Sequence, residues 1–299
     1  MTHLALVGPT ATGKSTLAVE VARRWPDVEL VSADSMQVYR GMDVGTAKPT
    51  PAEQAEVPVH LLDLTDPSED YSVADFQAAA AGVLAGIEER GHRALLVGGT
   101  GLYVRAVVDG LTIPGQWPQV RAELDAEPDT AALHARLRQA DPVAASRMEP
   151  GNRRRVVRAL EVVVGSGRPF SSFGAGLEAH PPSRFRMAGV WLPRPVVAAR
   201  IEARLAAMVA GGLVDETRRL AAAGLSRTAA QALGYKEVLR HLAGESTLEE
   251  AVAEAASRTR GFSRRQRMWF RRDPRVTWYG AAENPVAILP ALLGDWERP

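Results

Sequence analysis

The chain contains no cysteine, which excludes disulfide bonds, thiolate chemistry and cysteine-ligated zinc. No stretch approaches the roughly 20 consecutive apolar residues of a membrane-spanning helix. The N-terminus does not combine a basic segment with an apolar one, as a secretory signal does. These absences lead us to expect a soluble, cytoplasmic protein with no part in a membrane.

Net charge is also small, because 36 lysines and arginines are balanced by 35 aspartates and glutamates. A protein with so little excess charge binds nucleic acid only if its positive side chains are concentrated on one face. The length of 299 residues, 46% of them apolar, suffices for one large core and a second, smaller domain.

Three short apolar runs, at residues 4–7, 28–33 and 94–97, each end at glycine or at a polar pair. Helical spacing follows the first run, and Ser72 with Asp75 predicts the capped start of another helix. Strands that alternate with helices predict an α/β fold with a parallel sheet covered on both faces. Ligands of such sheets bind beyond the carboxyl ends of the strands. The glycine and polar residues that end the three apolar runs all lie there.

The pattern changes near Thr112, where TIPGQWP predicts a linker before arginine- and alanine-rich helical stretches. We therefore predict a core of residues 1–111 and 186–299 and an inserted, mostly helical subdomain of residues 112–185. The second part of the core is expected to hold a strand at 187–192 and helices at 196–210, 213–223 and 248–272.

The strongest motif is GPTATGKS, which fits the phosphate-loop (P-loop) pattern between a strand and a helix. Backbone N–H groups and the helix N-terminus would surround a diphosphate, the lysine would add a charge, and the serine hydroxyl could bind Mg²⁺. The alternative is a chance match on a tight turn. The predicted P-loop NTPase-like core thus has a diphosphate site made of Gly8, Pro9, Thr10, Ala11, Thr12, Gly13, Lys14 and Ser15.

Two further strand ends carry candidate chemistry. Asp34 would face the phosphates as a general base, or would cap the turn that follows it. Thr100 lies in VGGTGLYV, a glycine-rich corner that lets backbone approach a ligand closely, or that simply turns the chain.

Arginine is concentrated in two segments, NRRRVVRALEV and SRTRGFSRRQRMWFRR. Guanidinium groups beside aromatic rings suit RNA, whose phosphates and unpaired bases they can bind. The alternative for either segment is a solvated helix face with its aromatic residues in the core. Together with a P-loop, the two segments indicate chemistry on RNA.

The sequence resembles the tRNA dimethylallyltransferases, the tRNA isopentenyltransferases of the IPP transferase family. The resemblance spans residues 4–273 and rests on GPTATGKST, SADSMQVYRGMDVGTAKP, HLLDLTDPSEDYSVADF, LVGGTGLYVRAVVDGL, RRVVRALEV, ALGYKEV and RRQRMWFRRD. The second of these motifs is highly specific to the family.

The resemblance implies transfer of a dimethylallyl group from dimethylallyl diphosphate to N6 of adenosine 37, just 3′ of the anticodon, in tRNAs that read codons beginning with U. Mg²⁺ would be the cofactor, and no nucleoside triphosphate would be hydrolysed. The partners would be the tRNA anticodon stem-loop and the prenyl diphosphate, and the enzyme would act as a cytoplasmic monomer.

The family's site residues carry over by position. The resemblance implies Asp34 as the base, Thr100 beside it, and Arg218 as the arginine that reaches the diphosphate. Ser15 would be the metal ligand. The implied tRNA contacts are Ser35, Met36, Gln37, Arg121, Arg154, Arg155, Arg158, Gln231, Gly234, Tyr235, Lys236, Arg264, Arg265, Gln266, Trp269 and Arg271.

Two departures from the family pattern concern PGQWPQV before Arg121, and Val59-His60 where two histidines are usual. We assign no chemistry to His60. Rival functions are a small-molecule P-loop kinase, a prenyltransferase acting on free adenine nucleotides, and a non-enzymatic RNA-binding module whose P-loop senses nucleotide.

Overall fold

The computed structural model describes residues 1–174 and 176–297. They form two compact units. The core unit comprises Met1–Asp109 and the chain from Pro182 onward, and the inserted unit is Gly110–Pro181.

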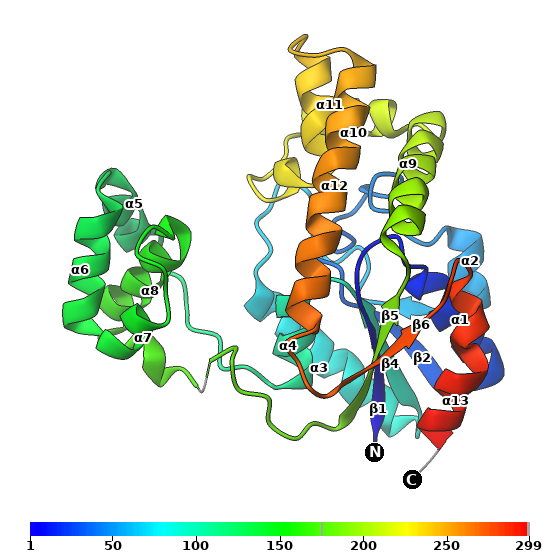
Figure 1. Ribbon diagram of the computed structural model, residues 1–299. Helices are drawn as coiled ribbons and strands as arrows, with labels where there is room; N and C mark the ends of the chain where they lie inside the picture. The colour runs from blue at the N-terminus through cyan, green and yellow to red at the C-terminus, as the bar shows by residue number, and fades with distance from the viewer. Residues whose placement is uncertain (175, 298–299) are drawn as a thin grey trace. The chain divides into compact units, whose positions relative to one another are not determined.

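The core unit contains a sheet of six parallel strands in the order β3-β2-β4-β1-β5-β6 (Figure 1). Val7 at the end of β1 is in register with Gly98 of β4 and Gly189 of β5. This sheet confirms the predicted α/β class. The strands are β1 (His3–Val7), β2 (Val28–Ser32), β3 (Val59–His60), β4 (Arg93–Gly98), β5 (Phe185–Trp191) and β6 (Val276–Gly280).

Helices cover both faces of the sheet, so its central strands are apolar on both sides. The helices and short 3-10 turns of the core unit are α1 (Lys14–Arg24), α2 (Pro51–Glu56), α3 (Val73–Glu89), α4 (Gly101–Val108), α9 (Arg194–Ala210), α10 (Leu213–Ala223), η2 (Ala229–Gln231), α11 (Tyr235–Leu242), α12 (Leu248–Phe270), η3 (Pro285–Ile288) and α13 (Leu289–Glu297).

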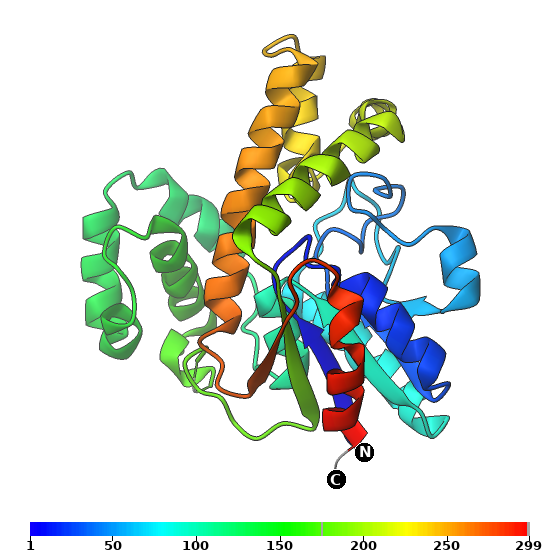
Figure 2. The ribbon, with the colours of Figure 1, turned by 45° about the vertical axis from the view of Figure 1, so that its right-hand side comes forward.

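Alternate residues of β1 enter the two cores. Leu4 and Leu6 pack with α1 and α13, which lie side by side in Figures 1 and 2. Ala5 and Val7 face the other way, into the larger cluster to which α3 and α4 contribute. This alternation is why a short apolar run at the N-terminus becomes the centre of the sheet.

The helix ends follow local sequence signals. Ser72 Oγ accepts a hydrogen bond from the N–H of Asp75, whose carboxylate accepts one from the N–H of Ser72, so the predicted capping box starts α3. Thr247 and Glu250 start α12 in the same way. Such reciprocal bonds satisfy N–H groups that a helix start otherwise leaves free.

The inserted unit is helical and has its own core of Leu124, Leu133, Leu137 and neighbouring apolar residues. Trp117, in the segment expected to be a linker, packs closely on Gly165, where a Cβ atom would lie 2.2 Å from the indole. The elements of this unit are α5 (Pro118–Ala126), α6 (Thr130–Ala140), α7 (Pro142–Ser146), α8 (Arg153–Ser166) and η1 (Phe170–Ser172).

Across residues 1–174 and 176–297, none of the helices has both the length and the apolar character needed to cross a bilayer.

Candidate functional site

Three loops meet at the carboxyl edge of the sheet because β2, β4 and β1 are neighbours there. The P-loop follows β1, Asp34 and Ser35 follow β2, and Thr100 follows β4. The N–H of Ser35 donates to Thr100 Oγ1 at 3.3 Å. Gly98 allows this approach, since a Cβ there would lie 2.4 Å from the carbonyl oxygen of Ala33.

The P-loop presents backbone N–H groups to a ligand. Gly13, with φ of 79°, precedes α1 without a side-chain cap, which leaves the first N–H groups of the helix available to an anion. Gly8, with φ of 139°, passes so close to β5 that a Cβ would lie 2.8 Å from the Val190 carbonyl oxygen. Glycine is required at both positions, and the loop suits a diphosphate.

Lys14 is the buried cation of this loop, with 9% of its surface exposed. Its Nζ donates to the carbonyl oxygen of Pro9 at 2.6 Å. Burial lowers the pKa of Lys14 to about 7, while Asp34 acts to raise it and Arg204 to lower it. A bound anion would restore the full charge of this lysine.

Arg204 of α9 is a site residue that the sequence analysis missed. Its Nε is buried and, among the described residues, has no hydrogen-bond partner. Burial lowers the pKa of Arg204, and the negative charge of Asp34 opposes that effect. A guanidinium group whose Nε has no hydrogen-bond partner in the described structure, close to Lys14 and Asp34, is suited to a phosphate. A signal was present, because Arg204 falls on the same helical face as Ile201, Leu205 and Met208, which are buried.

Arg218 is the arginine that the resemblance implied for the diphosphate. It is on α10, where its exposed side chain forms an ion pair with Asp215. Within the described part of the chain, its recorded partner is this aspartate and no group of the P-loop. Arg204 is thus a further candidate for the diphosphate, close to Lys14 and Asp34, and the role of Arg218 stays a prediction.

Asp34 caps the turn that follows β2, and its role as a general base stays a prediction. Oδ1 accepts a hydrogen bond of 2.9 Å from the N–H of Met36, so the carboxylate does cap the turn. Oδ2 makes no hydrogen bond to the residues that the structure describes, and the carboxylate interacts electrostatically with Lys14 and Arg204. One oxygen thus fixes the side chain, and the other is available for chemistry.

Gln266 links α12 to two of the three loops. Its Oε1 accepts from the N–H of Thr10 at 2.8 Å, and its Nε2 donates to the carbonyl oxygen of Gly99 at 2.9 Å. The side chain is buried, and nearby Trp269 packs on Gly101, where a Cβ would lie 2.2 Å from the indole nitrogen. Gln266 was predicted to contact tRNA, but in this structure it holds the P-loop against the glycine-rich corner.

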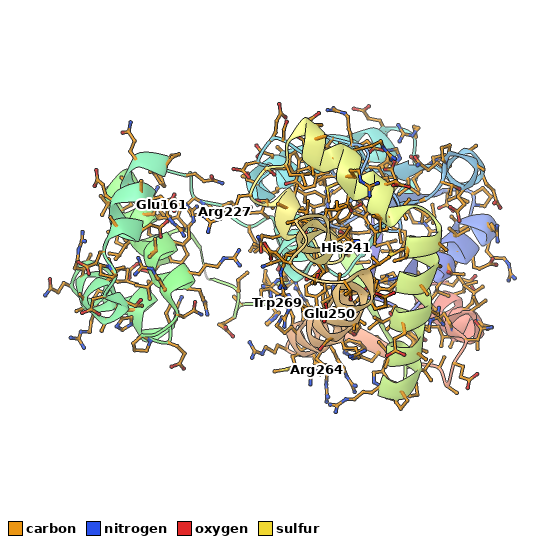
Figure 3. All side chains as sticks on the ribbon, turned by 90° about the horizontal axis from the view of Figure 1, so that it is seen from above. Glu161, Arg227, His241, Glu250, Arg264 and Trp269 are labelled. Carbon is orange, nitrogen blue, oxygen red and sulfur yellow. The ribbon has the colours of Figure 1, made fainter. Side chains whose placement is uncertain are left out.

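Several arginines of the late segment are accessible. Arg264, Arg265 and Arg271 are exposed, and Arg264 and Trp269 point to different sides of α12 (Figure 3). A pocket of about 560 Å³ adjoins the P-loop through Pro9 and Thr12. Its basic lining residues are Arg194, Arg260, Arg264, Arg267 and Arg271.

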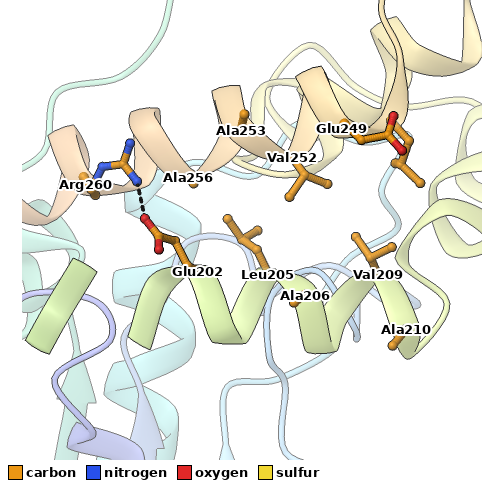
Figure 4. Close-up of a pocket in the computed structure, with 11 residues that line it drawn as sticks. Glu202, Leu205, Ala206, Val209, Ala210, Glu249, Val252, Ala253, Ala256 and Arg260 are labelled. Carbon is orange, nitrogen blue, oxygen red and sulfur yellow. Dashed lines mark hydrogen bonds and ion pairs between the residues drawn. The ribbon is translucent and has the colours of Figure 1, made fainter. Parts of the chain in front are cut away.

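A larger pocket of about 710 Å³ lies between α9 and α12 (Figure 4). Leu205, Val209 and Val252 line it, and an ion pair between Arg260 and Glu202 closes one end at 3.0 Å. Its lining is mainly aliphatic, with Glu202, Glu249 and Arg260 as the charged members, and includes no residue of the P-loop, so size alone does not identify the site.

In the inserted unit, burial divides the predicted tRNA contacts. Arg154 and Arg155 are exposed on α8. Arg158 instead binds Glu161 at 2.8 Å and the carbonyl oxygens of Pro114 and Gly115. Arg121 is paired with Asp125 and lies 3.8 Å from Glu161. The first two arginines are free for a ligand, whereas the other two hold the unit together.

The predicted tRNA contacts at residues 231–236 also include both buried and accessible residues. Gly234 and Tyr235 are buried, and the Tyr235 hydroxyl donates to Glu216 at 2.6 Å. Gln231 and Lys236 remain partly accessible and bond to each other at 2.7 Å.

His60 bonds to Glu29 at 2.7 Å, which is a structural role.

These features define a class: an α/β protein with a P-loop, a carboxylate and a half-buried arginine at the edge of a parallel sheet. A family model described as IPP transferase matches residues 37–273, and one described as isopentenyl transferase matches residues 1–64. The chain belongs to the IPP transferase family.

Named relatives cover nearly the whole chain. A tRNA dimethylallyltransferase of Salinispora arenicola (strain CNS-205) is 52% identical over 286 residues, covering 94% of this chain and 83% of its own. One of Streptomyces coelicolor is 50% identical, covering 99% and 96%. The solved full-length tRNA isopentenylpyrophosphate transferase of Bacillus halodurans is 40% identical, with a TM-score of 0.73 and coverage of 99% and 97%.

Proposed function

We propose that this protein transfers a dimethylallyl group from dimethylallyl diphosphate to the exocyclic amine of adenosine 37 in tRNA, giving N6-dimethylallyladenosine and diphosphate. The names of the close relatives support the reaction. The observation that carries it in this chain is the P-loop beside a carboxylate with one unengaged oxygen. That pair can hold a diphosphate leaving group and accept a proton.

In this mechanism the P-loop amides bind the diphosphate, and Lys14 and Arg204 face its negative charge. As the C1–O bond of the prenyl group breaks, charge builds on the diphosphate, and these cations stabilise it. The amine nitrogen forms its bond to C1 while Asp34 Oδ2 accepts the departing proton. Ser35 and Thr100 lie beside this carboxylate and would orient the adenine.

Mg²⁺ would be shared between the protein and the diphosphate. No group of three histidine, cysteine, aspartate or glutamate residues within the described ranges could enclose a metal ion. This suits Mg²⁺, which binds few protein ligands together with substrate phosphates. Ser15 fits, because it is exposed in the first turn of α1. The bound ion would neutralise charge on the leaving group.

The RNA partner is the anticodon stem-loop of tRNAs that read codons beginning with U. The exposed arginines Arg154, Arg155, Arg264, Arg265 and Arg271 would bind its phosphates. The target adenine must leave the anticodon stack, which costs a few kcal/mol that backbone contacts offset. We propose a cytoplasmic monomer, with the inserted unit as a tRNA-binding element.

The test is mass analysis of anticodon-loop nucleosides after purified protein, Mg²⁺, dimethylallyl diphosphate and tRNA are incubated together. The expected product is one dimethylallyl group on adenosine 37. An unmodified tRNA, together with phosphoryl transfer from ATP to a small acceptor, would instead support a P-loop kinase. Prenylation of free adenine nucleotides at equal efficiency would reject tRNA as the acceptor.

A further inference from the structure

A buried carboxylate on α10 holds a loop at the edge of the site. Glu216, 3% exposed, accepts hydrogen bonds from the backbone N–H groups of Asp43, Val44 and Gly45 at 3.1, 2.9 and 3.1 Å. The Tyr235 hydroxyl donates to the same carboxylate at 2.6 Å. Four donors on one carboxylate fix the position of residues 43–45.

Close packing reinforces these bonds. At Gly45 a Cβ atom would lie 2.4 Å from the Tyr235 ring. On the other side of the loop, the buried ammonium of Lys48 bonds to the carbonyl oxygen of Tyr39 and to Asp43 and Asp63, at 2.8, 2.6 and 2.6 Å. Two buried charges of opposite sign therefore determine the path of residues 43–48.

This loop in turn holds Gln37, three residues after Asp34. Gln37 Nε2 donates to the carbonyl oxygens of Thr46 and Ala47 at 3.2 and 3.3 Å, and Oε1 accepts from Ser32 Oγ at 2.8 Å. Ala47 has φ of 50°, a conformation that is unfavourable for alanine and that the surrounding contacts must maintain. The carbonyl groups that orient Gln37 thus depend on a strained turn.

The amide of Gln37 has little freedom left. Nε2 makes two hydrogen bonds and Oε1 accepts one, so an acceptor position remains on Oε1 of a half-buried side chain three residues after Asp34. An acceptor fixed at one place can read a donor of the substrate, such as the exocyclic amine of a base. A rotating amide could not discriminate in this way.

We propose that Glu216 is a positioning residue for recognition of the acceptor base. Through the amides of residues 43–45 it sets the turn whose carbonyl groups orient Gln37, and Tyr235 keeps the Glu216 carboxylate in place. The inference rests on the proposed function, because it assumes an RNA acceptor next to Asp34. The ALGY segment, residues 232–235, would then affect RNA binding indirectly, through the bond from Tyr235 to the buried Glu216 carboxylate.

The test is Glu216→Gln, which keeps the shape of the side chain but turns one acceptor oxygen into an N–H donor facing backbone N–H groups. Steady-state kinetics would vary tRNA and dimethylallyl diphosphate separately. We expect the KM for tRNA to rise about tenfold, and the KM for dimethylallyl diphosphate to stay within about twofold. Tyr235→Phe, which leaves the three amide bonds intact, should produce a smaller rise.

A double-mutant cycle with Gln37→Ala separates positioning from stability. If Glu216 acts through Gln37, Glu216→Gln should raise the KM for tRNA less than about twofold in the Gln37→Ala background. Glu29→Gln is the matched control, since Glu29 also accepts several hydrogen bonds but lies at the start of β2. It should leave both KM values unchanged.

Several results would overturn the proposal. These are an unchanged KM for tRNA in soluble Glu216→Gln protein, a lower kcat with both KM values unchanged, and additive effects in the cycle. If Glu216→Gln does not fold, an additive cycle between Tyr235→Phe and Gln37→Ala would have the same force. If the wild-type protein does not prenylate tRNA at all, the proposed function itself fails, which these kinetics distinguish from the failure of Glu216 alone.

Discussion

A buried N–H donor without a partner is costly, and Arg204, which is half-buried, keeps its Nε in that state near Lys14 and Asp34 within the described part of the chain. The negative charge of Asp34 offsets part of this cost, but the positive charges of Lys14 and Arg204 repel each other. A dianionic ligand would satisfy both cations at once. Repulsion between the two cations is therefore unfavourable in the free protein, and binding of a diphosphate would relieve it, which is common at active sites.

Replacing Arg204 by glutamine should lower the single-turnover rate of dimethylallyl transfer by about 10²–10³, because a cation facing the leaving group is lost. Thermal stability should be retained or raised, since a half-buried cation whose Nε has no hydrogen-bond partner among the described residues is removed. Arg218→Gln is the control and should stay within about twofold, because its side chain is exposed and paired with Asp215. The opposite ranking in rapid-quench measurements would restore Arg218 to the diphosphate site.

Asp34→Asn separates the two roles of Asp34. The remaining carbonyl oxygen can still accept from the N–H of Met36, so the turn and the affinity for tRNA should be kept within a few-fold. The single-turnover rate should fall by about 10²–10⁴, since the proton acceptor is lost. Filter binding and rapid quench measure the two quantities. Equal losses in binding and rate would make Asp34 purely structural.

At the scale of elements, α12 supports the site through Gln266, which bonds to the P-loop and to the loop after β4. Gln266→Ala would leave the N–H of Thr10 and the carbonyl group of Gly99 without their partner. We expect a loss of about 1–3 kcal/mol in the free energy of unfolding, measured by urea denaturation. Arg265→Ala, an exposed neighbour, should change it by less than about 0.5 kcal/mol. Similar values for both would show that the Gln266 bonds contribute little to stability.

Local sequence signals predicted the elements that carry them. The P-loop, the capped start of α3 and the central strands follow from spacing over a few residues. Local signals did not predict α11, β6 or α13, since these elements are short and their packing depends on distant residues. Spacing also did not show which arginines of the two arginine segments are buried or paired. Arg154 and Arg158 are both on α8, yet Glu161 pairs with only the second of them in the described structure.

At the scale of the whole molecule, the site is assembled from parts far apart in sequence. Sheet order brings residues 8–15, 34–37 and 98–101 together, and the family resemblance predicted this set. Arg204, Glu216 and Gln266 come from helices near the end of the chain, and their contacts with those loops depend on tertiary packing. Helical spacing puts Arg204 on the apolar face of its helix, but it could not show which loops that face meets.

Glu29 should make part of the stability depend on pH. Hydrogen bonds from Arg90, and then from His60 and His92, hold the pKa of Glu29 at about 2, although burial opposes them. A carboxyl group with a lowered pKa in the folded state stabilises fully above its unfolded pKa of about 4.5, and this stabilisation is lost as the pH falls through about 2. The advantage of wild type over Glu29→Gln should shrink from up to about 3 kcal/mol at pH 6 towards zero near pH 2. Denaturation curves at several pH values measure it, and a constant difference would contradict the assignment.

The inserted unit should contribute to tRNA affinity through charge. Arg154 and Arg155 are exposed on α8, so reversing both to glutamate should remove two phosphate contacts without disturbing the core of the unit. Affinity should fall about 10–100-fold, and the slope of log K against log salt should decrease by about 1–2. The matched control reverses Arg136 and Arg138, which are exposed on α6, and so makes the same change in net charge. Equal effects of the two double variants would mean that the unit attracts tRNA only by its overall charge, whereas a larger effect on α8 would identify that helix as the contact surface.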